Sequence, residues 1–291
     1  MRRLFLAVAV IGALLVPTSS ALAAPKGEFV NFAQCPLTNP ALEQCFYSAS
    51  VGGEVTTGAK TVPIKNKQVL QGGVDYVVEG NLFGPINFLA AANGDTFSKT
   101  PQAVPGGLLG VTAPTWWPKL LQDLFNQTIN EGFTGVTATT ELAAPVSSIK
   151  LNFGNSFLQS GTALELPVKI KLSNPFLGNS CYIGSNSNPI VWKLTTGTTA
   201  PPAPNKPITG SPGTPELNPA GDLLKFKEVK LVDNSFATPG ASGCGGFLFS
   251  WAVDPFVNSI VGIPSPAGKN TAILVNNIEI AVPQSVKNSE L

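Results

Sequence analysis

The clearest pattern in the chain is an alternation of apolar and polar residues with a period of two. It is strongest over residues 162–172, whose apolar members are Leu164, Leu166, Val168, Ile170 and Leu172. Such alternation places an aliphatic face and a polar face on a half-buried antiparallel strand. Proline cannot donate a hydrogen bond to a neighbouring strand, so Pro167 predicts an edge strand or a bulge here.

Shorter apolar runs predict more strands, separated by turns rich in glycine, asparagine and proline. These strands are expected at residues 74–78, 86–91, 135–142, 148–153, 190–194, 223–232, 246–253 and 271–282. Many short strands with such turns are typical of all-β proteins. We therefore expect an antiparallel β-sandwich or barrel, or two packed sandwiches.

Two short amphipathic helices interrupt this pattern. Residues 118–129 place leucines and phenylalanine on one face and begin with Pro118, which suits the first turn of a helix. Asp254 and Pro255 resemble an N-cap followed by a first-turn proline, and Gly262 ends the apolar periodicity that follows.

The first 23 residues have the three parts of a secretory signal peptide. Arg2 and Arg3 precede an apolar run of 13 residues, and small residues lead to a cleavage position between Ala23 and Ala24. The run is shorter than the roughly 20 residues that a membrane-spanning helix needs. Cleavage reduces the 18 Lys and Arg residues to 16 against 17 Asp and Glu residues, and no later segment is long and apolar enough to span a bilayer.

Four cysteines remain after cleavage, an even number that predicts two disulfides in an exported chain. Three pairings are open. We favour Cys35–Cys45 and Cys181–Cys244, because each pair then stays within one half of the chain. A metal site is disfavoured because the chain lacks both a CxxC spacing and histidine.

The domain organisation has two interpretations. A cluster of proline and glycine near residues 100–114 divides the chain into an N-terminal β region, 24–110, and a C-terminal β region, 111–291. One continuous β-domain over residues 24–291 is an equal alternative, because sandwiches commonly reach this size. Residues 195–222 hold seven prolines and predict an extended surface loop inside one domain.

Composition narrows the chemistry that this chain can perform. It has no histidine, charged residues make up 12% of it, and its net charge is +1. The absence of histidine excludes Ser-His-Asp and Cys-His catalysis, and the neutral balance argues against nucleic-acid binding. Two carboxylates could still hydrolyse a glycosidic bond, but no spacing singles out a pair. We expect a non-enzymatic protein without metal or cofactor.

Trp116 and Trp117 are the most distinctive local feature. They directly precede Pro118 and the predicted helix, in a chain with only four tryptophans. Adjacent indoles at a helix entrance suit sugar stacking, an interfacial membrane contact or the mouth of an apolar ligand site. The competing interpretation is structural, with one indole filling the junction between sheet and helix. These two residues are the candidate ligand-binding residues.

Several segments resemble a family of uncharacterised secreted proteins from actinobacteria. They are residues 32–36 (FAQCP), 181–190 (CYIGSNSNPI), 194–199 (LTTGTT), 201–210 (PPAPNKPITG), 232–237 (VDNSFA), 239–240 and 243–244. The resemblance covers most of the mature chain. It implies export and a Gram-positive origin, and it assigns no activity, cofactor or catalytic residue.

Three functions remain open from the sequence. The first is a disulfide-stabilised, non-enzymatic β-protein of the cell surface or extracellular space, whose partner would be envelope polysaccharide or another surface protein. The second is a secreted hydrolase that uses two carboxylates on a carbohydrate. The third is a carrier of an apolar or lipidic ligand, with Trp116 and Trp117 at its mouth.

The signal peptide gives a direct prediction. Mass spectrometry of the protein purified from its producing organism should find a mature chain that begins at Ala24, because small residues precede that bond. A mature chain that retains the apolar run after Arg3 would contradict this prediction.

Overall fold

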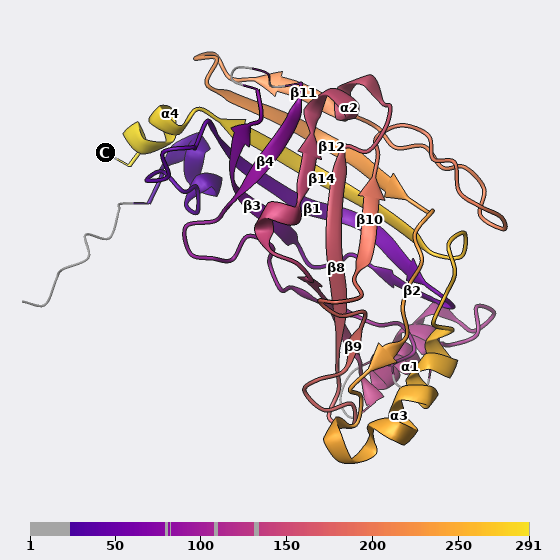
Figure 1. The fold of residues 1–291 in the computed structure, drawn as a ribbon. Helices are drawn as coiled ribbons and strands as arrows, with labels where there is room; N and C mark the ends of the chain where they lie inside the picture. Colours follow the sequence, from indigo (N-terminus) through magenta and orange to yellow (C-terminus); the bar gives the residue numbers. More distant parts are fainter. Residues whose placement is uncertain (1–23, 79–80, 82, 108–109, 131–133, 291) are drawn as a thin grey trace, which may run out of the picture.

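The computed structural model describes residues 24–78, 81, 83–107, 110–130 and 134–290. The described chain forms a 14-stranded antiparallel sheet with a few short helices, which confirms the predicted all-β class (Figure 1). The predicted signal peptide, residues 1–23, lies outside the described residues.

The sheet has the hydrogen-bonded strand order β11-β12-β14-β1-β3-β4-β7-β8-β6-β5. Three further pairings lie off this path: β2 with β1, β10 with β8, and β9 with both β8 and β13. The strands are β1 (Gln44–Thr57), β2 (Lys60–Pro63), β3 (Gln68–Tyr76), β4 (Pro85–Ala90), β5 (Pro101–Ala103), β6 (Thr137–Leu142), β7 (Lys150–Asn152), β8 (Leu164–Ser173), β9 (Tyr182–Ile183), β10 (Ile190–Leu194), β11 (Thr214–Leu217), β12 (Leu223–Asp233), β13 (Ala241–Ser242) and β14 (Thr271–Ala281).

The sheet is bent so that its two halves face each other across the main core, as in a sandwich. One buried cluster contains Phe46 and Leu70 from β1 and β3 together with Leu166 and Val168 from β8. The ring of Phe46 lies 5.3 Å from that of Phe88 in β4, in an edge-to-face arrangement. The sheet is not closed, because β11 and β5 end the strand order.

A second, smaller core lies on the other face of β1 and β14. The 3-10 helix η1 (Gly27–Phe32) and helix α4 (Pro283–Asn288) contribute the buried Phe32 and Val286 to it. Tyr47 and Ala281 contribute from the strands. Strand β1 is therefore buried on both faces, which makes it the centre of the fold.

The remaining helices are the 3-10 helix η4 (Val146–Ser148), α1 (Lys119–Asn130), α2 (Phe153–Leu158) and α3 (Gly246–Val261). The predicted helix at residues 118–129 is confirmed as α1. The strand predicted at residues 246–253 is wrong, because this segment is the first half of α3. Asp254 is not an N-cap, since it lies inside α3 together with Pro255, whereas Gly262 does end the helix in the left-handed region, at φ +73°.

Two strand predictions need correction in detail. Strand β8 is an interior strand with β10 on one side and β6 and β7 on the other, so the edge assignment of Pro167 is wrong. The carbonyl of Pro167 accepts a hydrogen bond from Ala143 N, on the side where β7 ends and β6 begins. The missing N–H of Pro167 therefore falls in a gap of the ladder. The strand predicted at 148–153 shortens to β7 (Lys150–Asn152).

Both predicted disulfides are present, Cys35–Cys45 and Cys181–Cys244. The second bridge encloses the proline-rich residues 195–222, which contain turns and the short strand β11 (Thr214–Leu217). The predicted surface loop is wrong at its start, because Thr195, Thr196 and Thr199 are buried. Bridges between Thr198 and Thr209 and between Ser211 and Lys230 hold this segment to itself and to β12.

The two disulfides should contribute unequally to stability. Their sequence separations are 10 residues for Cys35–Cys45 and 63 for Cys181–Cys244. A longer loop restricts the unfolded chain more. Replacing both cysteines of the long loop by alanine should lower the free energy of unfolding by about 4 kcal/mol, against about 3 kcal/mol for the short loop. Urea unfolding of the two double variants measures the order, and a larger loss from Cys35→Ala/Cys45→Ala would contradict it.

Candidate functional site

An apolar pocket of about 80 Å³ lies between the two halves of the sheet, beneath helix α3, and opens to solvent. Its walls are mostly aliphatic side chains from strands far apart in the sequence. The lining residues are Val55, Thr57, Lys60, Val62, Ile64, Gln68, Gln102, Val104, Gly107, Val136, Ala138, Thr140, Ile170, Leu172, Leu177, Ile183, Phe256, Val257, Ile260 and Val261.

Strands β6 and β8 form one wall of this pocket. Ala138 lies directly opposite Leu172, and Thr140 lies opposite Ile170. Alternate residues of a strand share a face, so these two cross-strand pairs present four neighbouring side chains to the pocket. The period-two patterns at 135–142 and 162–172 are the sequence signals for this wall.

The hairpin of β1 and β2 forms the opposite wall. Val55 pairs with Val62, and Thr57 pairs with Lys60. The two valines complete the apolar lining, whereas Lys60 brings an ammonium group to it. Sequence reasoning missed this wall, because strands β1 and β2 were not among the predicted elements.

The C-terminal half of α3 closes the pocket. Phe256, Val257, Ile260 and Val261 are spaced so that they share one helix face. The turn between β1 and β2 holds this end of the helix, because Ala59 N donates to Val261 O at 2.7 Å. Gly58 in that turn has φ +58°, and a Cβ there would collide with the carbonyl oxygens of Val261 and Gly262. A glycine is needed at this approach.

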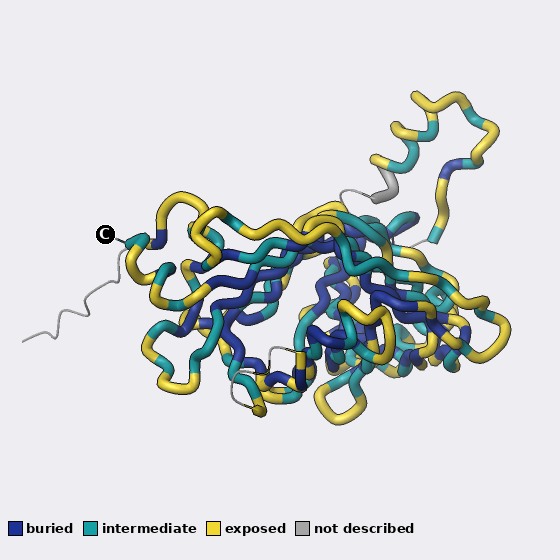
Figure 2. The backbone as a smooth tube through the Cα atoms, turned by 90° about the horizontal axis from the view of Figure 1, so that it is seen from above, coloured by how far each residue is buried: buried dark blue, intermediate teal, exposed yellow. Residues whose placement is uncertain are grey.

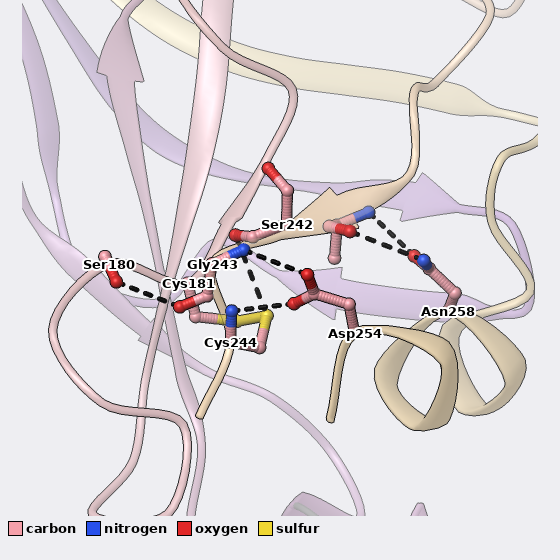
Figure 3. Close-up of a disulfide and its surroundings, with 8 residues drawn as sticks. Ser180, Cys181, Ser242, Gly243, Cys244, Asp254 and Asn258 are labelled. Atoms are coloured by element: carbon pink, nitrogen blue, oxygen red, sulfur yellow. Dashed lines mark hydrogen bonds between the residues drawn. A yellow bond between two sulfur atoms is a disulfide. The ribbon is translucent and has the colours of Figure 1, made fainter. Parts of the chain in front are cut away.

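A polar stripe on α3 fixes the helix to the disulfide (Figure 3). The carboxylate of Asp254 accepts hydrogen bonds from Gly243 N at 3.2 Å and from Cys244 N at 2.7 Å. One turn later, Asn258 Oδ1 accepts a hydrogen bond from Ala241 N of β13 at 2.7 Å. Cys244 is bonded to Cys181, which follows the end of β8. The helix over the pocket is therefore tied covalently and by hydrogen bonds.

The polar groups of the pocket differ in the hydrogen bonds and ion pairs that they form within the protein. Gln102 is buried, and its Oε1 accepts hydrogen bonds from the backbone N–H groups of Lys65 and Asn66. Lys60 Nζ donates to Gly110 O at 3.2 Å, and the ion pairs formed among the described residues do not include it. The pocket thus combines an apolar interior with an ammonium group for which the described residues supply no carboxylate partner.

Trp116 and Trp117 lie in the segment that carries α1, outside the pocket lining. Trp116 is 81% exposed, and its ring lies 6.1 Å from that of Trp117, which in turn packs 5.5 Å from Phe125 of α1. Gly107 and Val136, which precede and follow this segment, line the pocket. Figure 2 shows the segment projecting from the body of the protein. A ligand-binding role for the two indoles stays a prediction.

Among the described residues that line this pocket, none is an aspartate or a glutamate. Asp233, whose pKa is raised by burial, lies elsewhere, where its carboxylate accepts hydrogen bonds from Lys193 N and Ser235 N. These two bonds oppose the effect of burial and give Asp233 a structural role. Within the described ranges, no three cysteine or acidic side chains come together as a metal site would require.

The chain matches no protein-family model, and searches of curated proteins and of solved structures give no match either. Within the described part of the chain, no helix is long and apolar enough to cross a membrane.

Asp254 should hold the turn at Cys244 in place. Replacing Asp254 by alanine leaves the N–H groups of Gly243 and Cys244 without their acceptor, which should weaken protection of these two amides by about 1–3 kcal/mol. Hydrogen exchange measures this change. The control is Asp123→Ala, which removes an exposed ion pair on α1 and should leave both amides unchanged. Equal protection in Asp254→Ala and the wild type would contradict the described role.

Proposed function

We propose that this is an exported, disulfide-stabilised, non-enzymatic β-protein that binds the apolar chain of an acidic amphiphile in the pocket beneath α3. The pocket carries the proposal. Its volume of about 80 Å³ has room for roughly six water-sized groups, which suits a short chain or the end of a longer one. Apolar walls with few placed polar groups are the usual composition of a small-molecule site.

The position of Lys60 supports an acidic head group. Its ammonium group lies at the pocket, where the carbonyl of Gly110 is a neutral partner. A carboxylate or phosphate on the ligand would supply a negative charge that the described residues do not bring to Lys60, and charge-assisted hydrogen bonds are stronger than neutral ones. The aliphatic walls would hold the chain while Lys60 orients the head.

Export is supported by two features. The N-terminal residues have the pattern of a cleavable signal peptide, and all four cysteines are paired in disulfides, which persist in oxidising compartments. We place the protein outside the cytoplasm, at the cell envelope or in the extracellular space, consistent with the Gram-positive origin that the sequence resemblance implies.

The other two functions have less support from the pocket. A carboxylate-dependent hydrolase needs two acidic side chains at its cleft, and the described part of this lining contributes none. Binding to envelope polysaccharide or to another surface protein is a second candidate, favoured by the exposed indole of Trp116, since exposed tryptophans often contact sugars and proteins.

A fluorescent fatty acid tests the proposal. The purified protein should enhance the emission of cis-parinaric acid, and decanoic acid should compete. Ala138→Phe fills the pocket and should weaken binding at least about tenfold. Lys60→Gln should weaken binding of the acid about fivefold and leave binding of decanol unchanged, because it removes one partly exposed charge.

Lys65→Gln is the matched control, because Lys65 is an exposed lysine of the same hairpin region that does not line the pocket. Near-ultraviolet circular dichroism shows whether Ala138→Phe retains its fold. Saturable binding that is equal in the wild type and in folded Ala138→Phe would contradict the pocket as the site.

A further inference from the structure

The N-terminal half of α3 exposes an apolar surface that the binding pocket does not use. Four side chains form this α3 apolar surface, and their exposed fractions are 97% for Phe247, 70% for Leu248, 61% for Phe249 and 79% for Trp251. Soluble proteins tolerate scattered exposed apolar residues, but a contiguous group of large ones marks an interaction site.

These side chains are spread around the helix. Successive residues of an α-helix are separated by about 100°, so positions 247, 248, 249 and 251 span roughly 200° of the circumference. A single flat protein partner covers one face of a helix. The apolar region of a lipid bilayer can surround the end of a helix, so it can bury all four side chains at once.

The charge distribution also favours a neutral apolar phase. Asp254 is the one ionisable residue of α3, and its carboxylate is turned toward the N–H groups of Gly243 and Cys244. The outward surface therefore carries no charge and offers no basic side chain to an anionic partner. Tryptophan and phenylalanine are the residues that prefer the boundary between water and hydrocarbon in a bilayer.

Helix α1 adds a second apolar surface, on the segment that projects from the body of the protein (Figure 2). Leu120, Leu121 and Leu124 are exposed along it, next to the exposed Trp116. Lys119 and Asp123 pair with each other at 3.2 Å, so their charges are mutually neutralised. The α1 apolar surface consists of these three leucines and Trp116.

We propose that the α3 and α1 apolar surfaces hold this protein on a lipid bilayer as a peripheral protein. The side chains would enter the interfacial region of the outer leaflet. Helix α3 has 16 residues and a length of about 24 Å, which is too short to cross the hydrocarbon core. Attraction comes from apolar burial without basic residues, so zwitterionic lipid suffices.

This proposal goes beyond ligand binding in the pocket and stands without it. The two are adjacent, because Phe256 and Ile260 of the same helix line the pocket. An amphiphile in the outer leaflet would then lie next to the pocket that binds it.

Phosphatidylcholine vesicles test the bilayer contact. The wild type should float with the vesicles equally at 50 mM and 500 mM NaCl, because charges do not drive binding. The emission of Trp116 and Trp251 should shift to the blue and be quenched by brominated lipid. Phe247→Ser/Trp251→Ser should bind at least about tenfold more weakly, since each side chain contributes apolar burial.

Val30→Ser/Leu217→Ser is the matched control. Both residues are exposed and apolar, in η1 and β11 away from α3, so the variant should bind vesicles like the wild type. Leu120→Ser/Leu124→Ser should also weaken binding. All substituted side chains lie at the surface, and intact disulfides with unchanged near-ultraviolet circular dichroism confirm folding.

Three results would overturn the proposal. One is failure of the wild type to bind the vesicles, and another is binding to anionic vesicles alone that is lost at 500 mM NaCl. The third is sedimentation of the wild type as a dimer that Phe247→Ser/Trp251→Ser makes monomeric, without vesicle binding, which would make a second copy of the chain the occupant. Ala138→Phe separates the two functions, since it should lose fatty-acid binding and retain vesicle binding.

Discussion

The pairing of β1 with β14 is the contact on which the rest of the structure depends. It aligns residues 45–56 with residues 271–281, so it joins segments more than 200 positions apart in the chain. Strand β1 also pairs with β3 and β2, and its two faces are covered by the main core and by the smaller core under η1 and α4. Loss of this one pairing would detach β14, β12 and β11 from β1 and from the strands that follow it in the sheet order. Such distant pairing also predicts slow folding, because the closure of a long loop precedes the contact.

Helix α3 links the sheet to the proposed functions, because different residues on its surface contact the body of the protein, the pocket and the solvent. Asp254 and Asn258 bind the body, Val257 and Val261 face the pocket, and Phe247 and Trp251 remain uncovered. Each set of residues has a different neighbour, which explains why a helix with so much apolar surface has no single buried stripe. Asp254 and Asn258 fix the position of α3 by hydrogen bonds, so its apolar side chains remain available for the pocket and for the exposed surface.

How closely each strand could be predicted from the sequence depends on whether one or both of its faces are buried. Strands β8, β10, β12 and β14 were predicted closely, since their apolar residues alternate or cluster between clear turns. Strand β1 was missed, because burial on both faces replaces alternation with a mixed run interrupted by Gly52 and Gly53. The apolar run at 246–253 predicts a strand, but this segment is the first half of α3. The contacts that hold the helix, which are those of Asp254 and of the disulfide, are tertiary and leave no local signal in the sequence.

The candidate site could be predicted only in part for a similar reason. Alternation in β6 and β8 indicated which side chains point inward, but not that a space remains between them and the β1–β2 hairpin. Lys60 has no local pattern that distinguishes it from the other lysines. Its position depends on a turn that is fixed by Gly58 and by the buried side chain of Asn270, whose Oδ1 accepts a hydrogen bond from Gly58 N.

The bridge between Cys181 and Cys244 has a consequence for when the site is assembled. It ties the turn before α3 to the segment after β8, and thiols stay reduced in the cytosol. On the proposed export route, a chain still in the cytosol therefore holds α3 by hydrogen bonds and apolar packing, without the covalent tie. Formation of this disulfide would be the last step that fixes α3 against the body of the protein. The exposed apolar side chains of α3 would then be held rigidly only in the compartment that contains the proposed bilayer surface.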